Sequence, residues 1–221
     1  MSSAGLTREL IALRVARELR DGMVVNLGIG LPTLVANFLP QDADVILHAE
    51  NGILGYGGIV TDESVFDQDL INAGGQPVTL IAGASFVDSA SSFAMIRGGH
   101  VDVTVLGGLQ VSAKGDLANW AVSGRVGGAI GGAMDLAAGA KRVIVAMEHT
   151  TRDGEPRILE ECTYPLTATR CVDLIVTNLA VIEVTEDGLA LREVAPGISM
   201  EEVQAATAAR LDVADTRVMD L

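Results

Sequence analysis

Residues 23–39, MVVNLGIGLPTLVANFL, carry the pattern from which the fold class can be predicted. A short β-branched run ends in a glycine-containing loop, and a helix-compatible segment follows it from Pro32. The same order recurs along the chain. Further runs that predict strands followed by loops occupy residues 44–52, 78–85, 101–108, 142–148 and 173–178, and helix-compatible segments occupy residues 88–99 and 131–140. This alternation is typical of an α/β domain in which helices flank a mainly parallel central sheet.

The segment before this alternation predicts a helix. Residues 8–22, RELIALRVARELRDG, have apolar side chains at helical spacing and end in Gly22, which we expect to stop the helix. No linker and no repeat of fixed period interrupts the rest of the chain. We therefore expect one domain over residues 1–221.

Two further local signals lie near the C-terminal end. Residues 180–194 predict a hairpin that turns at Asp187-Gly188. Ser199, with Glu202 three residues later, predicts a capping box at the start of a helix.

The composition indicates a globular chain with an aliphatic core. Of the 221 residues 49% are hydrophobic and 20% are charged, which argues against disorder, and the aromatic content of 3% leaves the core to Val, Ile, Leu and Ala. The net charge is -14 and the 15 basic residues are scattered, so nucleic acid is not an expected partner. No stretch approaches the roughly 20 apolar residues of a membrane span. The N-terminal MSSAGLTREL has no signal-peptide pattern, and we expect a cytoplasmic protein without a membrane partner.

The loop NLGIG suggests one possible binding site, because glycines after a strand let a pyrophosphate approach the backbone. The dinucleotide pattern is incomplete. Gly28 and Gly30 are followed by Thr33, where the pattern requires glycine, and no Walker lysine is present. A lone G-x-G is more often a turn, but a nucleotide-binding oxidoreductase domain remains an alternative hypothesis.

Other chemistry-bearing residues give weaker signals. The histidines lie far apart without metal-ligand spacing, no G-x-S-x-G occurs around Ser85, and the two cysteines are expected to be reduced, buried thiols. We therefore expect no metal and no bound cofactor. Arg97 is compatible both with an anion site and with a solvated helix end. The histidines and cysteines are His48, His100, His149, Cys162 and Cys171.

Glu50 is a stronger candidate. It follows an apolar run that predicts a strand, and in parallel sheets ligands bind beyond the carboxyl ends of the strands. A carboxylate held there among small residues can be a nucleophile. It can equally be a turn-capping acid next to Asn51-Gly52, a dipeptide that favours tight turns. Residue chemistry leaves both hypotheses open.

The run LHAENGILG, residues 47–55, closely resembles the active-site signature of the β subunit of the 3-oxoacid coenzyme A-transferases, the family I CoA-transferases. In that family the glutamate of Ser-Glu-Asn-Gly is the catalytic nucleophile. Six more segments resemble the family in the same order, so the resemblance covers nearly the whole chain and implies the family's α/β fold. They are residues 26–37, 69–79, 92–102, 115–120, 131–136 and 161–167.

The resemblance implies a ping-pong transfer of coenzyme A (CoA) through a glutamyl-CoA thioester on Glu50. Succinyl-CoA is the expected donor and acetoacetate the expected acceptor. Transfer to 3-oxoadipate, or between acetate and acetoacetate, is the alternative within the same mechanism. A non-catalytic subunit that keeps only the fold is an alternative of another class, and the Glu-Asn-Gly triplet argues against it.

The resemblance also assigns roles to further residues. Gly132 is similar to the glycine whose backbone N–H stabilises the oxyanion, and Asn26 and Asn51 resemble positions that line the approach of CoA. We also expect substrate contacts from Gly28, Gly30 and Gly52, walls from the small residues beside Glu50, and glycines after it that open access to the carboxylate. CoA enters as a substrate and no separate cofactor is implied.

The chain departs from the family pattern at three places. Ala49 replaces the serine before the glutamate, VGGAI at residues 126–130 replaces a loop in which Gly-Met is common, and Gly75 stands where some members have a lysine that faces CoA. The chain also lacks the Gly-Gly-Phe-Gly signature of the α subunit. We therefore expect a partner chain, the α subunit of a CoA-transferase, in an α2β2 assembly.

Overall fold

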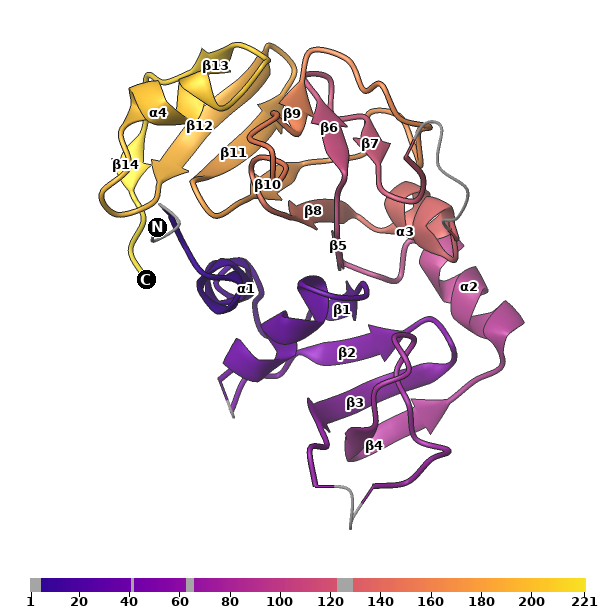
Figure 1. Ribbon diagram of the computed structural model, residues 1–221. Coiled ribbons are helices and arrows are strands. Elements are labelled where there is room, and N and C mark those ends of the chain that lie inside the picture. The colour runs from indigo at the N-terminus through magenta and orange to yellow at the C-terminus, as the bar shows by residue number, and fades with distance from the viewer. Residues whose placement is uncertain (1–4, 41, 63–65, 123–128) are drawn as a thin grey trace.

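The computed structural model describes residues 5–40, 42–62, 66–122 and 129–221 (Figure 1). Its main feature is an 11-stranded sheet with the order β13-β12-β11-β10-β8-β5-β1-β2-β3-β4, in which β14 also pairs with β12. The strands are β1 (Val24–Leu27), β2 (Ile46–Ala49), β3 (Ile53–Ile59), β4 (Val78–Phe86), β5 (Val103–Leu106), β8 (Arg142–Ala146), β10 (Leu174–Val176), β11 (Ala180–Thr185), β12 (Gly188–Val194), β13 (Leu211–Asp212) and β14 (Arg217–Val218).

The centre of this sheet is parallel, as predicted. Strands β2, β1, β5, β8 and β10 pair parallel to one another, whereas β3 and β4 at one edge and β11 and β12 towards the other pair antiparallel with their neighbours. All four residues of β5 are buried, as expected for a strand that is covered on both faces. The functional loops follow the carboxyl ends of these central strands.

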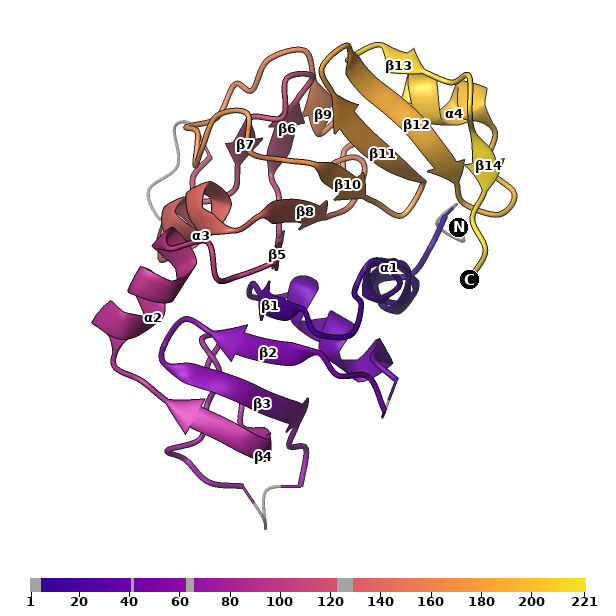
Figure 2. The same cartoon turned by 180° about the vertical axis from the view of Figure 1, so that it is seen from behind.

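Helices cover both faces of the parallel centre (Figures 1 and 2). One face packs against α1 (Arg8–Ala16) and the 3-10 helix η1 (Pro32–Phe38), and we call it the α1 face. The other packs against α2 (Ser89–Arg97) and α3 (Ala133–Gly139), and we call it the α2–α3 face. Both views show α2 and α3 side by side at one end of the sheet.

The C-terminal signals are confirmed. Strands β11 and β12 form the predicted hairpin. Helix α4 (Met200–Ala205) begins with a complete capping box between Ser199 and Glu202. A small sheet that the sequence did not predict, with the order β7-β6-β9, joins β6 (Gln110–Ser112), β7 (Leu117–Ala118) and β9 (Ile158–Leu159). Its strands are too short to show a periodic pattern. In the described parts of the chain no helix combines the length and apolar character needed to cross a membrane.

The first helix is shorter than predicted. It ends at Ala16, and the next turn is tightened by bonds from Glu18 N–H to Val15 O and from Leu19 N–H to Ala16 O. Gly22, at φ +81°, instead turns the chain into β1. The helical spacing of apolar residues continued beyond Ala16 because the following turn also packs against the core.

The glycine run after Glu50 is also different from the prediction. Gly55, Gly57 and Gly58 lie within β3 and do not form an open loop. A Cβ at Gly55 would approach the Cα of Ala84 in β4 to 3.2 Å, so this glycine permits close and irregular pairing of the two strands. Access to Glu50 must come from other loops.

Candidate active site

Glu50 lies in the tight turn between β2 and β3. Gly52 in this turn has φ +125°, and a Cβ there would collide with the backbone carbonyl of Val87. Gly52 N–H donates to Ala49 O, and Val87 N–H donates to Gly52 O, each at 2.9 Å. Because these turn contacts are made by backbone atoms, the Glu50 carboxylate can point away from the turn.

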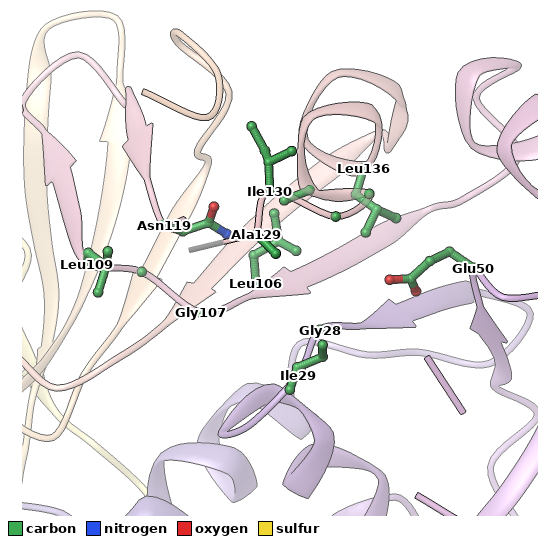
Figure 3. A pocket seen from close by; sticks show the side chains of 14 residues that line it. Gly28, Ile29, Glu50, Leu106, Gly107, Leu109, Asn119, Ala129, Ile130 and Leu136 are labelled. Atoms are coloured by element: carbon green, nitrogen blue, oxygen red, sulfur yellow. The ribbon is translucent and has the colours of Figure 1, made fainter. Parts of the chain in front are cut away.

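The carboxylate points into a cavity of about 320 Å³ (Figure 3). Figure 3 shows Glu50 reaching across from one side, with Gly28 and Ile29 on one wall and Leu106 and Leu136 on the other. The lining comes from the loops that follow β1 and β5 and from the start of α3. The lining residues are Gly28, Ile29, Glu50, Leu106, Gly107, Gly108, Leu109, Asn119, Ala129, Ile130, Gly131, Gly132, Ala133 and Leu136.

Asn26 binds the carboxylate from the neighbouring strand. Its amide nitrogen Nδ2 donates to Glu50 Oε2 at 2.9 Å and lies 3.2 Å from the backbone carbonyl oxygen of His48. Asn26 is 0% exposed, whereas Glu50 is half-buried. A buried donor thus holds one oxygen of the carboxylate while the other side remains reachable from the cavity.

His48 completes a buried polar cluster beneath α2. Its Nδ1 lies 3.3 Å from Asn26 Nδ2, and its Nε2 lies 2.9 Å from the hydroxyl of Ser92 in α2. Burial lowers the pKa of His48 below its ordinary value, although the charge of Glu50 acts in the opposite direction. The imidazole is therefore neutral at neutral pH.

Gly132 immediately precedes α3 and lies against Glu50. A Cβ at this position would come within 3.6 Å of Glu50 Cγ and within 2.9 Å of the ring of Phe93. Its φ of −85° is accessible to any residue, so space and not backbone conformation requires glycine here. The absence of a side chain keeps the backbone of residue 132 open to a group bound at Glu50.

Other predicted residues lie at different distances from this centre. Gly28 lines the cavity, and Gly30, at φ +92°, shapes the same loop and accepts a bond from the Thr33 hydroxyl at 3.0 Å. Asn51 is exposed and its Nδ2 donates to Ile71 O at 2.7 Å, which directs it away from Glu50. Gly52 shapes the turn.

The walls expected from the residues beside Glu50 come from elsewhere. Ala49 is 3% exposed and packs in the core of the α1 face with Ile53 and Tyr56. It does not appear among the described residues that line the cavity, and neither do Asn51 and Gly52. In a strand, successive side chains alternate between faces, which separates residue 49 from its neighbour His48.

The other two departures from the family pattern give less information. Residues 126–128 of VGGAI lie outside the described residues, while Ala129 and Ile130 line the cavity. Gly75 is exposed, and a Cβ at this position would meet open space.

A second cavity of about 230 Å³ adjoins the first and shares Ile29, Gly107 and Gly108 with it. Arg8 and Arg157 line this cavity together with Glu148. Arg157 Nη1 is 3.5 Å from the carbonyl oxygen of Gly108, so the guanidinium lies next to the shared loop. Two cations therefore lie one cavity away from Glu50.

The remaining candidates have structural partners. Arg97 pairs with Asp135 at 2.6 Å and lies over the Phe93 ring, so it joins α2 to α3. The cysteines are half-buried free thiols, and burial raises the pKa of each to about 11, which opposes a thiolate role. Within the described ranges no three His, Cys, Asp or Glu side chains are grouped as a metal site.

Sequence reasoning missed Ser92 and Phe93, and it weighed His48 only as a metal ligand. These residues belong to α2 and β2, which are distant in sequence from β1. No local pattern identifies them, because only the packing of α2 on the sheet brings them to Asn26 and Gly132.

Comparison with known proteins identifies the family. The family model described as Coenzyme A transferase matches residues 8–206. The chain belongs to the coenzyme A transferase family. The matched segment contains all of the site described above, from Asn26 to Leu136.

Full-length relatives of the chain carry several names. It is 52% identical to the β subunit of the acetate CoA-transferase of Escherichia coli K12, covering 94% of each chain. It is 53% identical to the corresponding subunit of the 3-oxoadipate CoA-transferase of Pseudomonas putida KT2440, over 90% of this chain and 93% of that one. It is 49% identical to the corresponding subunit of the succinyl-CoA:3-ketoacid coenzyme A transferase of Helicobacter pylori, over 93% of this chain and 99% of that one.

Solved structures confirm the α/β fold. The acyl-CoA transferase YdiF of E. coli O157:H7 superposes with a TM-score of 0.78 at 26% identity as the apoenzyme, and with a TM-score of 0.75 at 25% identity as a thioester complex with CoA. These matches cover 97% and 100% of this chain, which spans only 43% and 44% of YdiF. The decarboxylase AibA/AibB shares the fold at 22% identity, with a TM-score of 0.72 and coverage of 97% and 89%. Because a decarboxylase has this fold, the reaction must be argued from the site.

Proposed function

We propose that this chain transfers CoA from an acyl-CoA to a carboxylic acid through a thioester on Glu50. The observation that carries the proposal is the position of the Glu50 carboxylate: it points into the main cavity and accepts a bond from the buried Asn26. A carboxylate that is held by one oxygen and open at the other can attack a carbonyl group.

In the first step an oxygen of Glu50 attacks the thioester carbonyl carbon. The carbon–sulfur bond breaks, which gives a mixed anhydride and CoA thiolate. The thiolate then attacks the glutamyl carbonyl carbon, the original acid leaves as a carboxylate, and a glutamyl-CoA thioester remains. A second acid runs the same steps in reverse. No water enters, so the free energy of the thioester is retained.

Two donors fit the charge that develops in these steps. Asn26 Nδ2 is 2.9 Å from Oε2, the oxygen that becomes the glutamyl carbonyl oxygen when the other oxygen attacks. This donor would stabilise the negative charge whenever the glutamyl carbon is attacked. We assign to the backbone N–H of Gly132 the corresponding role for the oxygen of the incoming acyl group. Loss of one such donor typically costs on the order of a hundredfold or more in rate.

The adjoining cavities suggest the path of CoA. From Glu50 the first cavity runs past Gly28 and Gly107 to the second, where Arg8 and Arg157 lie. We propose that the pantetheine arm follows the glycine loops and that the two guanidinium groups face the CoA phosphates, for which arginine geometry is well suited. Binding energy from this distant end could then support the chemistry at Glu50.

We also propose that the chain works with an α-subunit partner in an α2β2 assembly. The names of the full-length relatives designate each of them as the second of two lettered subunits, which implies another kind of subunit in those enzymes. The relatives do not agree on the acids. We propose succinyl-CoA and acetoacetate as the substrate pair, and acetate and 3-oxoadipate, which the other relatives' names contain, are the rival acids.

The decisive experiment co-expresses the chain with its α-subunit partner. The purified complex is incubated with one acyl-CoA at a time without an acceptor, and the intact masses of the chains are recorded. We expect this chain to gain the mass of CoA less one water, and Glu50→Gln, which keeps the size of the side chain, to gain nothing. Turnover without such an adduct, or turnover by Glu50→Gln, would refute the covalent mechanism.

The same complex decides the substrate pair. The value of kcat/KM is measured for succinyl-CoA with acetoacetate, succinyl-CoA with 3-oxoadipate, and acetyl-CoA with acetoacetate. We expect the first pair to give the highest value. A higher value for either rival pair would replace the substrate assignment and leave the mechanism intact.

A further inference from the structure

We propose that His48 and Ser92 act as a positioning pair that fixes which end of the Asn26 amide faces Glu50. This inference rests on the proposed function, because it concerns the donor used when the glutamyl carbon is attacked. Neither residue needs to touch the substrate. Both are buried, with exposures of 1% for His48 and 0% for Ser92.

The pair belongs to a polar row across three parallel strands. Asn26 in β1 is in register with His48 in β2 and with Thr104 in β5. Registered residues of parallel strands point to the same face, which here is the α2–α3 face. Ser92 reaches His48 from α2 above this row. The Asn26 amide therefore has His48 on one side and Thr104 on the other.

The contacts show which end of the amide faces Glu50. The end near Glu50 is 2.9 Å from the carboxylate oxygen Oε2 and 3.2 Å from the carbonyl oxygen of His48. Both atoms are acceptors, so this end must be the nitrogen. The opposite end, Oδ1, is buried and has no hydrogen-bond partner among the described residues, and the same is true of the Thr104 hydroxyl. The β5 side therefore provides no bond that would hold the amide.

The His48 ring supplies the missing constraint. Its Nδ1 lies 3.3 Å from Asn26 Nδ2, which is a donor, so Nδ1 must present its lone pair. The proton of the neutral ring is then on Nε2, 2.9 Å from the Ser92 oxygen that accepts it. Ser92 thus selects the tautomer, and the tautomer selects the orientation of the Asn26 amide.

This constraint matters most when Glu50 has reacted. The free carboxylate attracts the amide nitrogen by its own charge. In the anhydride and in the thioester that charge is gone, and a rotated amide would turn its oxygen towards the glutamyl carbonyl. The His48 nitrogen and carbonyl oxygen still hold the donor in place at the stage when the next attack needs it.

A double-mutant cycle tests the inference in the assembled enzyme. His48→Leu removes the acceptor and should lower kcat roughly tenfold, the usual scale for one hydrogen bond, with little change in the KM for acyl-CoA. In an Asn26→Ala background the same change should have no further effect, because His48 acts only through Asn26. His48→Gln should restore most of the rate, because its amide carries one acceptor and one donor.

Two further variants separate positioning from folding. Ser92→Ala should lower kcat in the same direction as His48→Leu, and it keeps the test open if His48→Leu fails to assemble. Thr104→Val is the matched control: it removes a buried hydroxyl on the other side of Asn26 and should leave kcat unchanged. Thermal unfolding midpoints of all variants show whether each complex is intact.

The outcomes distinguish the two proposals. If wild-type enzyme forms the CoA adduct but His48→Leu lowers kcat by the same factor with and without Asn26, the positioning role is wrong. A loss in Thr104→Val as large as that in Ser92→Ala would also overturn it. If the wild-type complex forms no adduct on this chain, the proposed function itself fails.

Discussion

A fall in pH from about 7.5 to about 5 should destabilise this protein by about 2 kcal/mol through one side chain, His149. This residue follows β8 and is 0% exposed. Its Nδ1 lies 2.9 Å from the Thr177 hydroxyl, and its Nε2 lies 2.8 Å from the Thr207 hydroxyl. Because the Thr207 hydroxyl donates to Val203 O, it accepts from Nε2–H, and the ring is held in a neutral tautomer.

The magnitude follows from the pKa. Burial lowers the pKa of His149 from 6.5 to about 4. The unfolded chain therefore binds a proton in a pH range where the folded protein does not. Stability is complete above the unfolded pKa and falls as the pH drops towards the folded one. At about pH 5 nearly all of the unfolded side chain is protonated and little of the folded one, which amounts to about 1.5 pK units at about 1.36 kcal/mol each.

Urea unfolding of the wild type and of His149→Gln at both pH values measures this contribution. Glutamine can bond to both threonines but does not titrate in this range. We expect the variant to lose about 2 kcal/mol less than the wild type over the same pH interval. Acid-sensitive carboxylates such as Glu18 and Glu193, whose pKa values are lowered by their arginine partners against the effect of burial, contribute equally to both proteins. Equal pH dependence in the two proteins would refute the reasoning.

Three other predictions concern the site. Gly132→Ala should reduce kcat by at least about tenfold with little loss of stability, because the methyl group would crowd Phe93 and the Glu50 side chain; steady-state kinetics and thermal unfolding check this. Unchanged kcat would show that the space beside Gly132 is not used. Gly52→Ala should lower the unfolding free energy by about 2 kcal/mol or more, because φ +125° and the Val87 carbonyl both oppose a side chain. Urea unfolding measures it, and full stability would mean that the turn can rearrange. Arg157→Ala should raise the KM for acyl-CoA by about fivefold to tenfold and leave kcat within about twofold, as expected for loss of one cation facing a phosphate. An unchanged KM would place CoA elsewhere.

The predicted fold class needed only local information. Alternating strand and helix segments indicated a mainly parallel sheet, and the hairpin and the capping box were found because their signals lie within a few residues. The antiparallel edge formed by β3 and β4 was not predicted, because glycines in β3 suggested a loop. Whether glycine opens a loop or allows two strands to approach depends on what lies beside it, and sequence alone does not contain that information.

The candidate site was divided in the same way. Glu50 and Asn26 were both found in the sequence, through their resemblance to a known family, but not the bond between their side chains. That bond exists because β1 and β2 pair parallel with Asn26 in register with His48. Residues 49 and 51, which flank the glutamate in the sequence, face other parts of the protein.

The sequence by itself therefore determined the fold class, the family and the identity of the reactive carboxylate, because these depend on local patterns and motifs. The tertiary structure alone decided what surrounds that carboxylate. The register of the strands places the Asn26 donor beside Glu50, and the packing of α2 places Ser92 on His48. The physical reason is that hydrogen bonds act over about 3 Å in space. Separation along the chain carries no information about such distances until the sheet has formed.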